Sequence, residues 1–453
     1  MISHRQPAQP KSVLRGHRTQ VHATTFIRSN QRLASGDADG YVVLWDLTIM
    51  RPRAVWRAHT NAILGIADWG DDKIITHGRD NRLIVWKLDG QDESAMSTTL
   101  PLDESAAERP QPWILHILEV NTLNFCSFAS CTTRPDISHN ELLIAVPNTL
   151  QTEDVDIFQL PSQNRQHTIR LGGKAENKGM VMSLCLFWCD AYLTLTAAYE
   201  SGLAIVAQLG RNGTWDILYR AQVHSQPILS LDVSPQRDFF FTSGADAIIA
   251  KHPVPTTAFP VNESQQAKQT NSEAAKVSNP SLLSTALSSE PKTTMPSRHM
   301  EPVVETHPIK VINTKHSGQQ GLRIRSDGKI FATAGWDSKV RVYATKTMSE
   351  LAVLKWHEVG CYTVAFATIA DEQASNPTRL KIRNEKAGDK PEDEVATADI
   401  EDDRDTSIVT TQKITMQKLC QLSVKDRRIK MAKEAHWLAA GSKDGKISLW
   451  DIY

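Results

Sequence analysis

The chain has 453 residues, of which 40% are hydrophobic and 23% are charged, as is usual in globular proteins. Lys and Arg number 51, as do Asp and Glu, so no overall field favours nucleic acid or an acidic membrane. The first residues lack the apolar core of a signal peptide, and no apolar run approaches a membrane span. With only six cysteines, we expect an intracellular protein with reduced thiols.

Residues 33–46 have the pattern of a β-hairpin. The Gly and Asp residues at 36–40 tolerate the left-handed backbone of a tight turn, and residues 41–45 are rich in the β-branched and aromatic types that favour strands. The hairpin ends in Trp45 and Asp46, and Gly16 and His17 precede it. A Gly-His pair followed by a hairpin that ends in Trp-Asp is the signature of one propeller blade.

The hairpin recurs with a fixed spacing: a turn Asp, a Trp or Tyr six residues later, a Ser or Thr four residues before the Asp, and a His upstream. A buried indole N–H needs a hydrogen-bond partner, so we expect the Asp to bind the His ring and the hydroxyl to join that ring to the indole. We interpret these side chains as a buried network that fixes each blade, not as a catalytic set. The residues are His17, Ser35, Asp39 and Trp45; His59, Thr76, Asp80 and Trp86; His224, Thr242 and Asp246; His316, Thr333, Asp337 and Tyr343; and His357, Asp444 and Trp450.

Some blades depart from the signature. The last blade has Ala440 at the hydroxyl position, which predicts a broken or water-filled network, and His252 holds the Trp position of the fifth. Blades 3 and 4 are inferred from spacing, with Phe158 and Ala207 in the Trp positions. The strand candidates are 113–120, 123–129, 142–146 and 155–160 for blade 3, and 180–188, 192–198, 203–209 and 216–220 for blade 4, after a polar excursion at 89–109.

Two segments interrupt the repeats. Residues 256–305 are rich in Ser, Thr, Pro and Gln, which predicts a disordered loop within blade 5. Residues 371–433 form a charged insertion within blade 7, acidic at 392–405 and mixed basic at 413–433. A partner-selecting element and an unconstrained solvated loop both fit this insertion, since surface loops lengthen at little cost.

The strand predicted at 11–15 has no blade of its own, and the last blade lacks a fourth strand beside 446–453. Pairing the two would close the ring and remove its open edges. The prediction is therefore an all-β fold: one seven-bladed β-propeller over residues 1–453, closed by an N-terminal strand in the last blade.

The residues Gly16, His17, Trp45 and Asp46, with Trp450 and Asp451, resemble the WD-repeat β-propeller family. The layout of the two insertions and the ending KDGKISLWDIY are similar to fungal members of the ASTRA-associated protein 1 family. This resemblance implies a non-catalytic scaffold or adaptor in a chromatin-related complex, located in the nucleus with the cytoplasm as a second location. It also implies a phosphatidylinositol-3-kinase-related scaffold and its cochaperones as partners, with the chain monomeric within the complex.

The alternatives are a substrate receptor or signalling adaptor of another assembly and, less favoured, a propeller enzyme. The sequence has no H-E-x-x-H, P-loop or G-x-S-x-G motif, and the inner strands are mostly small or apolar. Cys185 and Cys189 lack C-x-x-C spacing and a matching pair, which favours buried thiols over zinc. We predict no catalytic residue, cofactor or metal, and no direct contact with nucleic acid or membrane.

Propeller geometry selects candidate partner-binding residues. The third and fifth residues after a blade His begin the inner strand at one rim, and the residue before a turn Asp projects from the same face. The candidates are Gln20, His22, Arg79, Trp336, Tyr362 and Lys443. A large aromatic in a turn, as at Trp336, is either a packing residue or an interface anchor, and the sequence leaves both open.

Overall fold

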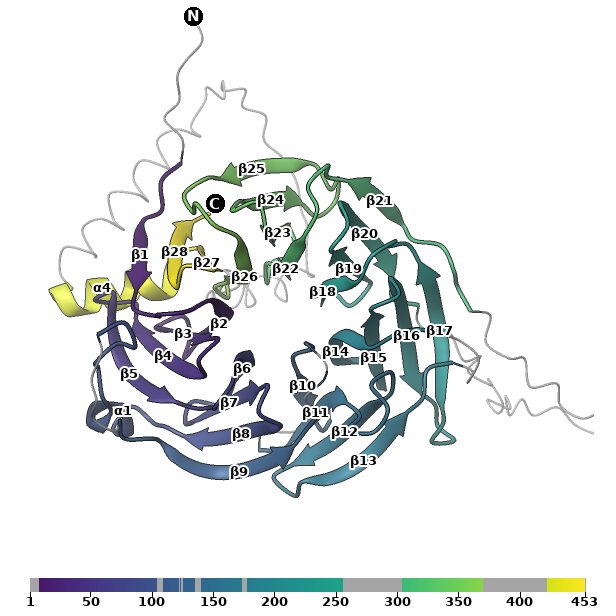
Figure 1. The fold of residues 1–453 in the computed structure, drawn as a ribbon, viewed down its shortest axis with the longest axis horizontal. Helices are drawn as coiled ribbons and strands as arrows, with labels where there is room; N and C mark the ends of the chain where they lie inside the picture. The colour runs from purple at the N-terminus through teal and green to yellow at the C-terminus, as the bar shows by residue number, and fades with distance from the viewer. Residues whose placement is uncertain are drawn as a thin grey trace, which may run out of the picture.

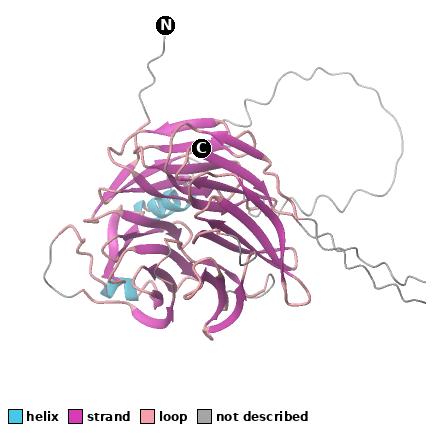
Figure 2. Ribbon diagram, turned by 45° about the vertical axis from the view of Figure 1, so that its right-hand side comes forward, coloured by secondary structure: helices cyan, strands magenta, loops and turns pink. Residues whose placement is uncertain are grey.

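The computed structural model describes residues 8–103, 109–121, 123, 125–134, 140–172, 177–255, 304–369 and 422–452. Its strands form seven four-stranded antiparallel sheets, arranged as blades around a central axis (Figure 1). The predicted all-β propeller is confirmed. Among the described residues two short helices accompany it, α1 (Asp92–Ala95) and α4 (Val424–Glu434), and neither is long and apolar enough to cross a membrane (Figure 2).

The first three blades are built in chain order from the axis outwards. Blade 1 contains β2 (Val21–Ile27), β3 (Arg32–Asp37), β4 (Tyr41–Asp46) and β5 (Arg51–Arg57). Blade 2 contains β6 (Ile63–Trp69), β7 (Lys73–Gly78), β8 (Arg82–Lys87) and β9 (Trp113–Glu119). Blade 3 contains β10 (Ala129–Thr132), β11 (Leu142–Pro147), β12 (Val155–Leu160) and β13 (Asn164–Ile169).

The remaining blades repeat this order, except the last. Blade 4 contains β14 (Val181–Cys189), β15 (Tyr192–Tyr199), β16 (Leu203–Leu209) and β17 (Trp215–Gln222). Blade 5 contains β18 (Ile228–Val233), β19 (Phe239–Gly244), β20 (Ile248–Pro253) and β21 (Lys310–Asn313). Blade 6 contains β22 (Gln319–Ile324), β23 (Ile330–Gly335), β24 (Val340–Ala344) and β25 (Glu350–Leu354). Blade 7 joins β26 (Cys361–Phe366), β27 (Trp437–Ser442) and β28 (Lys446–Asp451) to β1 (Ser12–Arg15).

The N-terminal strand closes the ring as predicted. β1 pairs with β28 in antiparallel register, from Ser12 opposite Leu449 to Arg15 opposite Lys446. Leu14, only 3% exposed, packs with Trp45 and Leu449 in a core cluster shared by blades 1 and 7. The hydrophobic core lies mainly between blades, which is why the second strands β3, β19, β23 and β27 are buried almost throughout.

The prediction that residues 113–120 belong to blade 3 is wrong. β9 pairs with β8 as the fourth strand of blade 2, and the outer strand of blade 3 is β13. The excursion before β9 returns over blade 1, where the carboxylate of Glu93 on α1 is buried among three arginines. Because the buried carboxylate of Glu93 is paired with these arginines, it holds the polar segment that contains α1 against blade 1. The sequence alone predicts only a loop here. The arginines are Arg28, Arg32 and Arg53.

Both predicted insertions fall largely outside the described residues. Of residues 256–305, the structure describes Val304 and Glu305, and Glu305 forms a parallel bridge with Tyr219 on β17. Of residues 371–433, it describes 422–433, which include most of α4. The side-chain amide of Asn30 donates to the carbonyls of Thr368 (2.7 Å) and Lys433 (3.1 Å), so it fastens both ends of this insertion to blade 1.

Candidate partner-binding face

Blades 1 and 2 each hold a buried hydrogen-bond network. In blade 2, Nδ1 of His59 donates to Asp80 (2.8 Å), its Nε2 lies 2.8 Å from the Thr76 hydroxyl, and the Trp86 indole donates to that hydroxyl (2.8 Å). Burial would raise the pKa of Asp80, but the hydrogen bonds from His59 and the Thr60 backbone lower it to about 2. The carboxylate is therefore charged at neutral pH.

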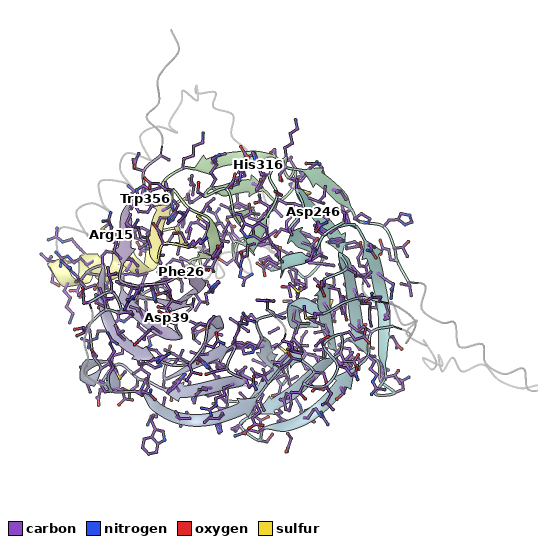
Figure 3. All side chains as sticks on the ribbon, viewed as in Figure 1. Arg15, Phe26, Asp39, Asp246, His316 and Trp356 are labelled. Atoms are coloured by element: carbon purple, nitrogen blue, oxygen red, sulfur yellow. The ribbon has the colours of Figure 1, made fainter. Side chains whose placement is uncertain are left out.

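In blade 1 the carboxylate belongs to Asp37, so the prediction of Asp39 is wrong. Nδ1 of His17 donates to the Asp37 carboxylate (2.7 Å), and its Nε2 lies 2.7 Å from the Ser35 hydroxyl. The Trp45 indole donates to that hydroxyl (2.8 Å). Asp37 also accepts the backbone N–H groups of Asp39 (3.0 Å) and Tyr41 (2.9 Å), which closes the hairpin turn from its first residue. Asp39 stands half-buried in the turn (Figure 3).

Blade 5 extends the network by one residue. His224 bonds Asp246 (2.9 Å) and lies 2.8 Å from the Thr242 hydroxyl. In the Trp position, Nε2 of His252 lies 2.8 Å from the same hydroxyl, and its Nδ1 lies 2.7 Å from the Tyr219 hydroxyl. Burial lowers the pKa of His252 to about 3. A neutral imidazole thus replaces the indole and needs Tyr219 because it has a second nitrogen to satisfy.

Blade 6 has exchanged its histidine for an arginine. The ring of His316 is 42% exposed and 3.8 Å from Asp337, so the predicted network member lies outside hydrogen-bond distance. Arg341, only 2% exposed, donates to Asp337 at 2.6 and 3.1 Å and takes the carboxylate that the sequence assigned to His316. The other two predicted members, Thr333 and Tyr343, are buried. Figure 3 labels His316 at the periphery.

In blade 7 the hydroxyl that Ala440 lacks is supplied by another strand, but the network stays incomplete because His357 Nδ1 has no hydrogen-bond partner among the described residues. His357 Nε2 lies 2.8 Å from the hydroxyl of Ser448, and the Trp450 indole donates to that oxygen at 2.9 Å. Ser448 is the direct cross-strand partner of Ala440, so β28 supplies the hydroxyl that β27 lacks. The predicted acceptor, Asp444, instead accepts from Ser442 and from Lys446 (2.5 Å).

Blades 3 and 4 lack this network in the described residues. Phe158, predicted in the Trp position, is half-buried opposite Ile144 on β11, and Ala207 is fully buried opposite Leu195 on β15. Blade 3 instead buries Asp156, which accepts hydrogen bonds from Asn148 (2.8 Å) and Thr168 (2.7 Å). Packing therefore stabilises both blades, and blade 3 adds the polar cluster around Asp156.

Five of the six candidate partner-binding residues belong to one arc of side chains across blades 6, 7, 1 and 2. The rings of His22 and Tyr362 stack at 5.5 Å between centroids and 8° between planes. Burial and nearby Arg79 lower the pKa of His22, against the opposite effect of Asp37, so its ring is neutral at pH 7. Arg79 lies over the Phe125 ring at 4.3 Å, which carries the arc into the loop before blade 3.

Gly360 joins the other end of the arc. The peptide N–H of Lys443 donates to the Gly360 carbonyl (2.9 Å), and a Cβ at Gly360 would meet both the Trp336 backbone and the Tyr362 ring. The Trp336 ring is fixed by its N–H bond to Gln320 (2.7 Å) and by Gly318, where any side chain would overlap it. It nevertheless remains 48% exposed. Gln20 lies on the same rim, with its carbonyl bonded to the Ala38 N–H (2.9 Å).

Sequence reasoning missed three members of this arc, because each is recognised only by its spatial neighbours. Phe125 lies in an irregular loop, and its 56% exposed ring supports Arg79. Gln320 and Gly360 orient Trp336. Among the described residues, no acidic side chain lies within ion-pair distance of Arg79. One stacked ring pair, the single rings of Phe125 and Trp336, and two cations, Arg79 and Lys443, therefore offer contacts to an apolar and acidic surface.

The described residues show no catalytic constellation. A cavity of about 260 Å³ between the inner strands of blades 1, 2, 6 and 7 is lined by small and apolar side chains together with Arg323. No described group of three or more His, Cys, Asp or Glu could hold a metal ion. Burial raises the pKa of Cys131 and Cys185 to about 12, so both remain thiols at neutral pH.

Comparison with known proteins identifies the family. The family model described as ASTRA-associated protein 1 matches residues 10–450. The chain is similar to the ASTRA-associated protein 1 of Pyricularia oryzae (50% identity over 99% of this chain and 98% of that protein) and of Verticillium alfalfae (49%, over 98% and 93%). The protein of that name from Schizosaccharomyces pombe is 33% identical over 82% of this chain and 98% of its own length. The chain therefore belongs to the ASTRA-associated protein 1 family.

Proposed function

We propose that the protein is a non-catalytic scaffold subunit of an ASTRA complex and that the arc around Trp336 holds a partner subunit. Family membership supports the assembly, since the relatives are named for their association with ASTRA. The supporting observation for the site is an indole that is fixed on one side by Gly318 and Gln320 yet 48% exposed. A rigid exposed Trp loses little entropy on binding, which suits an interface anchor.

The finer parts of this proposal come from the resemblance. They are a nuclear, chromatin-related role and association with a phosphatidylinositol-3-kinase-related protein and its cochaperones. The two cations of the arc, Arg79 and Lys443, predict that the partner surface carries carboxylates beside an apolar side chain. Imaging of a fluorescent fusion tests the location: exclusion from the nucleus would contradict this part.

The experiment compares Trp336→Ala with Ile49→Ala. Ile49 is 51% exposed in the turn between β4 and β5, away from the arc, and serves as the matched control. Each tagged variant replaces the native protein in a fungal host, and mass spectrometry quantifies the co-purified subunits. We expect Trp336→Ala to lose more than about tenfold of the bound assembly, because an anchor contributes at least about 2 kcal/mol. Unchanged thermal melting must accompany this loss, and full recovery of the assembly would refute the role of the arc.

A further inference from the structure

The outer strand of blade 2 exposes an apolar edge. β9 reads WILHILE and runs along the outer rim of the disc (Figure 1). Trp113 is 75% exposed, Ile114 40% and Ile117 41%. A sheet edge that faces water is normally protected by Lys, Pro or a covering segment, and β9 contains neither Lys nor Pro.

The backbone of β9 has hydrogen-bonding groups on this edge that no other described backbone segment engages. Val120 donates its N–H to the Asn81 carbonyl on the β8 side (3.0 Å), and the register continues through Leu118 opposite Leu83. Alternate residues of an antiparallel strand face opposite neighbours, so Ile117 and Glu119 direct their N–H and C=O groups away from β8. Among the described residues, no backbone segment pairs with this side of β9.

Two other outer strands, β5 and β17, already bind an additional backbone segment along the same kind of edge. On β5, the Val55 N–H donates to the Ser97 carbonyl at 2.8 Å. On β17, Glu305 bonds Leu218 and Arg220 through its own N–H (2.9 Å) and carbonyl (2.8 Å). In both places an extended piece of this chain lies on the outer edge as a fifth element. The blades can therefore accommodate an added backbone segment without rearrangement.

We propose that the free edge of β9 binds an extended segment of a partner protein as a fifth strand. The precedents at β5 and β17 predict the extended backbone, and the side chains of β9 predict its chemistry. His116 is engaged by Gln163 (3.3 Å), and Glu119 is the only charged residue in the strand, so little at this edge favours a charged segment. The partner segment should carry apolar side chains at alternating positions, where they cover Trp113 and Ile117.

Hydrogen exchange tests the proposal on the assembly purified from its fungal host. We expect the backbone amides of Ile117 and Glu119 to exchange at least about tenfold more slowly in the assembly than in the isolated protein. A photo-crosslinking amino acid in place of Trp113 should label a single segment of another subunit with alternating apolar residues. The matched control carries it in place of Ile49, which is 51% exposed in the turn between β4 and β5, off any strand edge, and should yield no such product.

Three results would overturn the proposal. Unchanged exchange at β9 in an intact assembly would show that the edge stays free. Cross-linking to a second copy of this chain would assign the edge to self-association. The third result concerns Ile117→Lys, because a lysine at this edge should block strand addition. If this variant melts normally and the photo-crosslinker at position 113 still labels the partner at the wild-type level, the edge is not the contact.

Discussion

Blades 2 and 7 both join a histidine ring to an indole through one hydroxyl, but the hydroxyls come from different strands. In blade 2 the hydroxyl is Thr76 on the second strand, whereas in blade 7 it is Ser448 on the third. The distances to the histidine are equal, 2.8 Å in both. Directly opposed residues of antiparallel strands project to the same side, about 5 Å apart, so a hydroxyl can move across the pair and still reach the ring. The two blades therefore share the position of an oxygen and not the strand position that supplies it.

The two blades also differ in how they are assembled. All four strands of blade 2 follow one another in the chain, although an excursion separates β8 from β9. Blade 7 gathers β1 from the N-terminus, β26 before the long insertion, and β27 and β28 after it. Asp80 completes the network of blade 2, but Asp444 is engaged elsewhere in blade 7. We expect blade 2 to depend on its network and blade 7 on closure by β1.

Deletion of residues 1–15 should have the largest effect. It removes β1, uncovers the edge of β28 and empties the site of Leu14 between blades 1 and 7. We expect aggregation or loss of soluble protein, measured by size-exclusion chromatography and thermal unfolding. Deletion of residues 1–7 alone is the control and should be tolerated. A soluble, equally stable protein without β1 would contradict the role of this strand in blade 7.

Asp80→Ala should destabilise the protein by about 1–3 kcal/mol, because His59 loses its buried acceptor. Asp444→Ala is the matched change in blade 7. It should cost less than about 1 kcal/mol, since the partners of Asp444 are a neighbouring serine and a half-exposed lysine. Denaturant unfolding of both variants measures the difference, and equal losses would show that the two turn residues have the same role.

The sequence predicted what is local and missed what depends on register. The well-marked blades and the network of blade 2 follow from a repeated local signature, and blades 3 and 4 follow from the spacing between the marked ones. Spacing counted from Trp45 predicts Asp39, but the carboxylate that binds His17 is Asp37, two residues earlier in the same turn. Ser448 could be identified only once β27 and β28 were aligned. The arc was partly predictable from propeller geometry, but Phe125 in its irregular loop carries no sequence signal.

Blade 2 should also be acid-sensitive through His77. This ring is 1% exposed, neither nitrogen has a hydrogen-bond partner among the described residues, and burial lowers its pKa to about 3. The unfolded chain binds the proton near pH 6.5, so stability falls as the pH drops from 6.5 towards 3, by about 2 kcal/mol at pH 5. Blade 7 has Gly441 at the equivalent position. His77→Leu should reduce the difference between the free energies of unfolding at pH 7 and pH 5 by that amount. An unchanged difference would show that His77 is not the source of the acid sensitivity.

Ser448→Ala gives the sharpest test of the comparison. It leaves His357 and the indole of Trp450 without their shared oxygen, which should cost about 1–2 kcal/mol in denaturant unfolding. If the oxygen is what matters, adding Ala440→Ser to this variant should recover much of the loss, because residue 440 lies directly opposite residue 448. The rescued blade would then carry its hydroxyl on the second strand, as blade 2 does. The Ala440→Ser change alone completes a double-mutant cycle and reports the cost of placing a hydroxyl in this fully buried position. If the double variant is no more stable than Ser448→Ala, a hydroxyl on β27 cannot replace the one on β28, and the equivalence of the two strands fails.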